Sequence, residues 1–122
     1  MTAHTLIVTL GGTRYRVERP WGDLPSGHVT DVAVDSRGHV SVLLRWDPLS
    51  DDTSPRVVEL APDGRRLAAW GATLIADSHM LATSGDRLLI VDRDAHEVVI
   101  TTRNGERLMG LGTRHHPLHP FN

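Results

Sequence analysis

Residues 54–71, SPRVVELAPDGRRLAAWG, recur 41 positions later as AHEVVITTRNGERLMGLG at residues 95–112. The two segments share a Val-Val pair, a glycine turn, an Arg-Leu pair and a final glycine. Each segment consists of two short apolar runs separated by Gly, Asp, Asn or Pro, which is the pattern of two strands and a turn. The recurrence therefore predicts an internal repeat made of β-hairpins.

The segments ahead of these hairpins also recur. HVTDVAVDSRGHVSVLLR precedes the first hairpin and SHMLATSGDRLLIVD precedes the second, with an offset of 48 that places His39 on Arg87. A period of about 40–50 residues that contains four strands is the signature of a β-propeller blade. We therefore predict an all-β fold, a β-propeller segment of about two four-stranded blades at residues 28–71 and 76–112.

The two ends of the chain flank these blades. TLIVTL and TRYRVE surround Gly11-Gly12, and two glycines supply the positive φ angles that a two-residue turn needs. An N-terminal hairpin is therefore expected at residues 5–18. Residues 113–122 are expected to lead to a next blade, which the chain does not contain.

Composition limits the classes of partner. The 122 residues suffice for one domain or part of one, and the formal net charge of -2 gives no basic surface for nucleic acid or membrane. The chain has no cysteine, which excludes disulfides and thiolate metal sites. The sequence shows no signal peptide and no transmembrane segment, and it leaves the compartment unknown.

The repeat resembles a known family. Val-Ala-Val-Asp, a glycine turn, an apolar strand, an Arg-Val strand and a closing Trp-Gly are similar to an NHL repeat over residues 28–112. Together with RYRVERPWGDLP and HPFN, the pattern most resembles bacterial six-bladed propellers related to peptidyl-α-hydroxyglycine α-amidating lyase. That resemblance implies a zinc-dependent lyase that releases glyoxylate from a hydroxylated C-terminal glycine.

The resemblance also implies roles for four residues. His79, in SHML, occupies the position of a zinc-binding histidine that begins an innermost strand. Arg45, in SVLLR, occupies that of an active-site arginine, the catalytic candidate. The backbone carbonyls of Val32 and Leu81 occupy those of a structural calcium site.

These roles agree with the chemistry of the groups. Zinc held by neutral imidazoles keeps an open position that polarises a substrate oxygen or a bound water. An arginine fork binds a carboxylate through two charge-assisted hydrogen bonds, which suits a small molecule or a peptide C-terminus as substrate.

Structural explanations compete with these roles. His79 could cap a strand at a wet channel mouth, and Arg45 could pair with acidic residues of the following loop, namely Asp47, Asp51 and Asp52. A solvated loop is the simpler explanation for His115, His116 and His119, and His96 is expected to be structural. Trp70 is expected to pack between blades, and Trp21 and Trp46 could line the channel mouth.

Two blades do not close a ring. The open surface must be covered by missing blades or by further copies of the chain, of which three would bring three His79 rings together. Three functions follow: part of a lyase-like metalloenzyme, a non-catalytic propeller module that binds a protein or peptide, or an inactive fragment. The arrival of further histidines at His79 would separate the first from the others.

Overall fold

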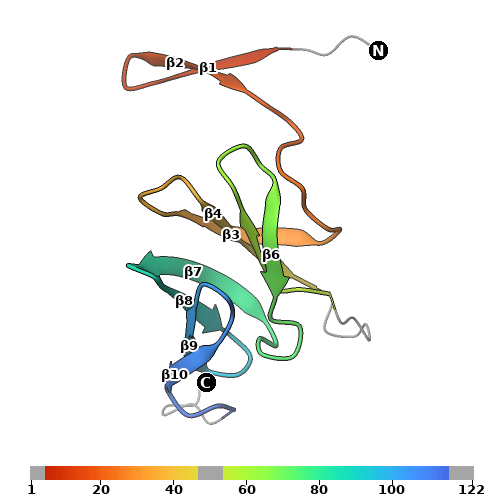
Figure 1. Ribbon diagram of the computed structural model, residues 1–122, viewed down its shortest axis with the longest axis vertical. Helices are drawn as coiled ribbons and strands as arrows, with labels where there is room; N and C mark the ends of the chain where they lie inside the picture. Colours follow the sequence, from red (N-terminus) through yellow and green to blue (C-terminus); the bar gives the residue numbers. More distant parts are fainter. Residues whose placement is uncertain (1–4, 47–53, 116–122) are drawn as a thin grey trace, which may run out of the picture.

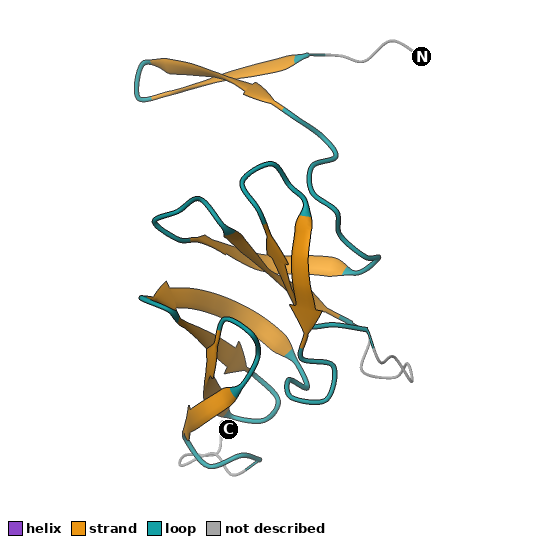
Figure 2. Ribbon diagram, viewed as in Figure 1, coloured by secondary structure: helices purple, strands orange, loops and turns teal. Residues whose placement is uncertain are grey.

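The computed structural model describes residues 5–46 and 54–115. Within these ranges the chain forms ten β-strands and no helix, arranged as three separate antiparallel sheets (Figures 1 and 2). The predicted all-β fold, with two four-stranded blades and an N-terminal hairpin, is confirmed. Residues 116–122 of the expected C-terminal linker lie outside the described residues.

Both large sheets run up and down in simple chain order. The first blade has the order β3-β4-β5-β6, and the second has the order β7-β8-β9-β10. The strands of the first blade are β3 (His28–Val34), β4 (Val40–Arg45), β5 (Val57–Leu60) and β6 (Arg66–Trp70). Those of the second are β7 (Ser78–Ser84), β8 (Arg87–Asp92), β9 (Glu97–Thr102) and β10 (Arg107–Leu111).

The strand register confirms the repeat. Val42 pairs with Val58 in the first blade as Ile90 pairs with Val99 in the second, which reproduces the offsets of 48 and 41. The outermost strands carry a bulge at the same repeat position, Leu67 in β6 and Leu108 in β10. Bulges at matching positions show that the two sheets are copies in geometry as well as in sequence.

The repeat offset between the innermost strands, β3 and β7, is 49 residues, whereas the offset between β4 and β8 is 48. Five residues lie between the paired Val34 and Val40, whereas four lie between the paired Thr83 and Leu88. The extra residue in the β3–β4 turn makes Thr30 the counterpart of His79. Both residues form the bulge near the start of their strand.

The main core lies between the blades, which face each other in Figure 1. Trp70 packs against this core from β6, which confirms its expected role. Burial of each such aliphatic side chain contributes about 1.5–3 kcal/mol, so the blades stabilise one another. The buried members of this core are Leu43, Val57, Ile75, Leu81, Leu88, Ile90 and Val99.

A smaller cluster covers the opposite face of the first blade. It consists of Val42, Leu44, Val58 and Leu60, with Leu24 from the segment before β3 packed on it. The N-terminal hairpin, β1 (Leu6–Leu10) and β2 (Thr13–Val17), pairs only with itself among the described strands. In the part of the chain that the structure describes, no helix is long and apolar enough to cross a membrane.

Candidate functional site

The end of β4 and the entry to β7 are joined through one buried carboxylate. Arg45 Nε lies 2.9 Å from Asp77 Oδ1, and Arg93 Nη2 lies 2.8 Å from Asp77 Oδ2. A buried charge needs partners of opposite charge, and the two guanidinium groups supply them. Asp77 is thus an ion-pair partner of Arg45. The loop residues Asp47, Asp51 and Asp52 lie outside the described residues.

His79 lies at the same rim. It follows Asp77 by two residues, forms the β7 bulge and is exposed to solvent. The Arg45–Asp77 ion pair therefore brings both predicted site residues to one end of the innermost strand. In residues 5–46 and 54–115, no group of three or more His, Cys, Asp or Glu side chains could hold a metal ion. His79 offers zinc one ligand here, so a zinc site would need ligands from elsewhere.

The carboxylate of Asp31 joins the two innermost strands. Its Oδ1 accepts a hydrogen bond from Val32 N at 2.9 Å, and its Oδ2 accepts one from Leu81 N at 2.8 Å. The backbone N–H groups of Val32 and Leu81 therefore donate to Asp31 and not to the neighbouring strands β4 and β8. In an antiparallel pair the N–H and C=O of one residue point the same way, so the carbonyls of Val32 and Leu81 also point away from β4 and β8. Two carbonyl oxygens supply only part of the six to eight ligands that calcium takes.

Trp46 and Trp21 lie at opposite ends of the first blade. Trp46 follows β4 and donates from Nε1 to Pro55 O at 3.1 Å, so it lies at the rim with Arg45. Trp21 lies against Gly64 in the β5–β6 turn, at the opposite end of the sheet. The expectation that Trp21 lines the mouth is therefore wrong, because the segment before β3 runs along the outer face of the blade.

Among the described residues, His96 and His115 lie in turns outside the innermost strands. His96 lies between β8 and β9 with a φ of 56°, which agrees with a structural role in the turn. His115 donates its backbone N–H to Ala95 O at 2.7 Å. The other two histidines of the predicted cluster, His116 and His119, lie outside the described residues.

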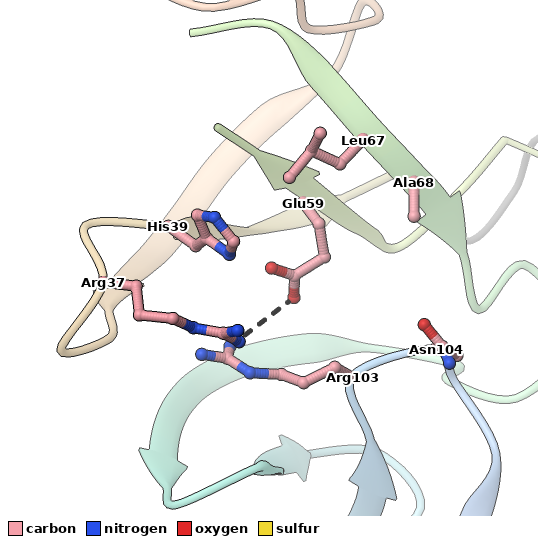
Figure 3. A pocket seen from close by; sticks show the side chains of 7 residues that line it. All are labelled: Arg37, His39, Glu59, Leu67, Ala68, Arg103 and Asn104. Carbon is pink, nitrogen blue, oxygen red and sulfur yellow. Dashed lines mark ion pairs between the residues drawn. The ribbon is translucent and has the colours of Figure 1, made fainter. Parts of the chain in front are cut away.

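A pocket of about 180 Å³ opens where the turns of the two blades meet (Figure 3). Charged and imidazole groups converge on one side of it, and two apolar side chains of β6 form the other side. It is lined by Arg37, His39, Glu59, Leu67, Ala68, Arg103 and Asn104. Both blades contribute to it, so their packing creates the site.

Arg103 is the central cation of this pocket. From the β9–β10 turn it donates through Nη2 to Asp35 Oδ2 at 2.7 Å and through Nη1 to Ser41 Oγ at 2.8 Å. Its Nη1 also lies 3.8 Å from Glu59 Oε1, the ion pair drawn in Figure 3. One side chain of the second blade thus bridges three polar groups of the first.

The pKa values of the two carboxylates beside Arg103 are shifted in opposite directions. Burial raises the pKa of Glu59 above its usual value, although the hydrogen bond from Ser41 and the charge of Arg103 act against this. Burial would also raise the pKa of Asp35. The backbone N–H groups of His39 and Arg37, together with Arg103, outweigh it and lower that pKa. Asp35 is therefore the charged partner of Arg103, and Glu59 is the carboxyl that takes up a proton more readily.

The raised pKa of Glu59 predicts a pH-dependent stability. Since the folded state holds the proton more tightly than the unfolded state, the Glu59 contribution to the free energy of unfolding falls as pH rises from about 4.5 through the raised pKa. Glu59→Gln removes this ionisation. The stability of the variant relative to wild type should therefore rise with pH in that window, as measured by urea unfolding at several pH values. Glu106→Gln, exposed on the β9–β10 turn, is the control. Parallel pH profiles for wild type and Glu59→Gln would contradict the account.

Sequence reasoning missed this pocket, although one signal was present. Glu59 is a charged residue in the apolar strand VVEL, and its repeat counterpart is Ile100. A charge at a core-facing position requires a partner, which indicates that some cation must reach β5. The sequence did not indicate that Arg103, 44 residues later, supplies it.

A scan of protein-family models found no match to the chain, and a search of curated proteins found none either.

Proposed function

We propose that the chain is a segment of an NHL-type β-propeller that serves as a binding module for ligands ending in a carboxylate, such as a peptide C-terminus. The observation that carries this proposal is the pocket between the blades. It places the guanidinium of Arg37 and the imidazole of His39 opposite Leu67 and Ala68. The NHL assignment rests on the sequence repeat, with its matching register and bulges in both blades.

Arg37 is the residue best placed to bind the carboxylate. Its side chain is 73% exposed and lies 3.8 Å from Asp35, too far for a hydrogen bond. Its donors are therefore available for a bidentate contact with a carboxylate. Arg103 is held by Asp35 at 2.7 Å and is largely buried, whereas the ion pair of Arg37 with Asp35 is longer and exposed, so Arg37 is the more accessible cation of the pocket. Leu67 and Ala68 would contact an apolar side chain on the last residue of the ligand.

A pair of peptides that differ only at the C-terminus tests this proposal. The free-acid form of a short peptide ending in an apolar residue should bind, and its amidated form should bind about 10–100 times more weakly. That ratio corresponds to one charge-assisted contact of about 1.5–3 kcal/mol. Isothermal titration calorimetry measures both affinities.

The matched variants are Arg37→Ala and Arg65→Ala. Arg37→Ala should weaken binding of the free acid about tenfold or more and abolish the difference between the two peptides. Arg65, exposed on the β5–β6 turn, should be replaceable without effect. Equal affinity of wild type for the acid and the amide would overturn the proposal, as would full binding by Arg37→Ala.

A second candidate function is supported by the rim at the start of β7. We propose there, as part of a complete ring, a zinc-dependent site resembling a peptidylamidoglycolate lyase, with His79 as one metal ligand and Arg45 as the substrate-binding cation. The Arg45–Asp77 ion pair supports this because it holds both residues at one strand entry. The further ligands would come from other blades or copies. The hub-facing carbonyls of Val32 and Leu81 are proposed to join a structural calcium site in the same ring.

Native mass spectrometry with and without zinc tests the second candidate. If the copies complete the site themselves, a trimer should retain one zinc, and His79→Ala should lose it. His96→Ala, in an exposed turn, is the control and should retain the metal. A chain that binds no zinc as monomer or oligomer would contradict zinc binding through self-assembly.

A further inference from the structure

In the described part of the chain, one apolar face of the N-terminal hairpin has no other strand packed on it. The register pairs Leu6 with Val17 and Val8 with Tyr15, and Leu10 lies on the same side of the hairpin. We call these five residues the hairpin face. Leu10 is 65% exposed, and the hairpin touches no other strand in the described part of the chain. Because an isolated two-stranded hairpin is only marginally stable in water, such a face gains most from being covered.

The second blade has a matching apolar face. It forms a shallow apolar pocket on the side turned away from the first blade. Met80, at its edge, is 56% exposed. We call this the open face, and its side chains are Met80, Ala82, Leu89, Val91, Val98 and Ile100.

The repeat shows that the open face occupies a core position. Val91 and Val98 are the counterparts of Leu43 and Val57, at offsets of 48 and 41. In the first blade those counterparts are fully buried against the second blade. The equivalent surface of the second blade is therefore built to be covered.

The chemistry of the open face selects an apolar occupant. Its Leu89 and Ile100 stand where the first blade has Ser41 and Glu59. Ser41 and Glu59 receive Arg103 from the neighbouring blade, whereas Leu89 and Ile100 offer an arginine no partner. A third blade with the same arginine turn would therefore bury an unpaired charge there. The hairpin face brings aliphatic side chains and Tyr15 instead.

The hairpin of the same chain is held too far from this face. The segment after it is fixed on the first blade, where Asp23 N donates to Gly64 O at 2.9 Å and Arg66 binds Asp23. Only residues 18–20 remain as a tether between the hairpin and Trp21, and they reach about 10–14 Å. Figure 1 shows the hairpin on one side of the first blade and the second blade on the other. Sheets pack about 10 Å apart, so the open face lies roughly two sheet layers away.

We infer that the hairpin face of one copy packs on the open face of a second copy. The two surfaces differ, so the contact is head-to-tail, and a pair of copies joined by it keeps one free hairpin face and one free open face. Repeated addition builds a ring or a chain of copies. The pocket residue Arg37 takes no part in this contact, so the inference stands apart from the proposed carboxylate-binding function.

The absence of native cysteine allows a direct cross-linking test. Full-length Val8→Cys, on the hairpin face, is mixed with full-length Ala82→Cys, on the open face, and treated with a short bismaleimide linker. We expect covalent dimers that contain one chain of each variant. The matched control is Thr9→Cys, on the other face of the hairpin, which should not link to Ala82→Cys. Cross-linking of Val8→Cys chiefly to itself would show that hairpins pack on hairpins and would overturn the inference.

Light scattering after size-exclusion chromatography provides an independent readout. Wild type should form species larger than one chain, with a mass that rises with concentration. Leu10→Glu and Met80→Glu should each raise the apparent dissociation constant about tenfold or more, whereas Thr9→Glu should leave it unchanged. Wild type that stays monomeric would overturn the inference. Co-flotation of wild type with phosphatidylcholine vesicles that is lost in Leu10→Glu would also do so, because it would assign the hairpin face to a lipid surface.

Discussion

Replacement of Arg103 by alanine is expected to lower the free energy of unfolding by about 3 kcal/mol. The variant loses the hydrogen bonds from Arg103 to Asp35 and Ser41, and it leaves Asp35 and Glu59 beside each other without a shared cation. Since Arg103 comes from one blade and its partners from the other, the loss weakens the interface between blades. Urea unfolding followed by tryptophan fluorescence measures the effect.

Two further variants determine whether the geometry of Arg103 or its charge is responsible. Arg103→Lys keeps the charge but loses the planar fork that reaches two acceptors at once, so it should restore only part of the stability. Arg65→Ala, on the exposed β5–β6 turn, should change the free energy of unfolding by less than about 0.5 kcal/mol. An Arg103→Ala chain as stable as Arg65→Ala would show that the polar contacts between the blades contribute nothing.

Replacement of Gly105 by alanine is expected to have an effect of similar size, about 3 kcal/mol. A Cβ at this position would lie 2.5 Å from Cδ2 of Trp70, and the backbone has a φ of +88°. Trp70 packs on the core between the blades, so it can yield only by disturbing that core. Thermal and urea unfolding should both show the loss.

Gly85→Ala provides the control because it separates backbone strain from steric overlap. Gly85, in the β7–β8 turn, has a φ of +59° and no atom within 4 Å of an added Cβ. This variant should therefore lose only about 1 kcal/mol, the usual cost of a side chain in the left-handed region. Equal losses at the two positions would indicate that Trp70 does not pack on the β9–β10 turn.

The sequence predicted the fold well because both of its signals lie in the order of the residues and need no knowledge of contacts between side chains. Short apolar runs and turn residues mark each strand, and the recurrence of SPRVVELAPDGRRLAAWG marks the blade. The extra residue in the β3–β4 turn was harder to place, since it shifts the innermost strands without changing their apolar pattern. Register pairing showed that Thr30 is the repeat counterpart of His79.

The candidate sites were predictable only in part because they depend on contacts between distant residues. The family resemblance singled out Arg45 and His79, and the structure places both at one rim. Their link through Asp77, 32 residues after Arg45, carries no sequence signature. The pocket at Arg103 likewise arises only when two blades pack face to face.

Backbone NMR during titration with the free-acid peptide tests the central claim most directly, because it separates the two candidate sites in one experiment. The account predicts that the amide chemical shifts that change are those of the pocket between the blades, at residues 36–39, 67–68 and 103–104. Changes confined to the rim instead, at residues 28–30 and 77–79, would contradict the claim that the blade junction is the binding site.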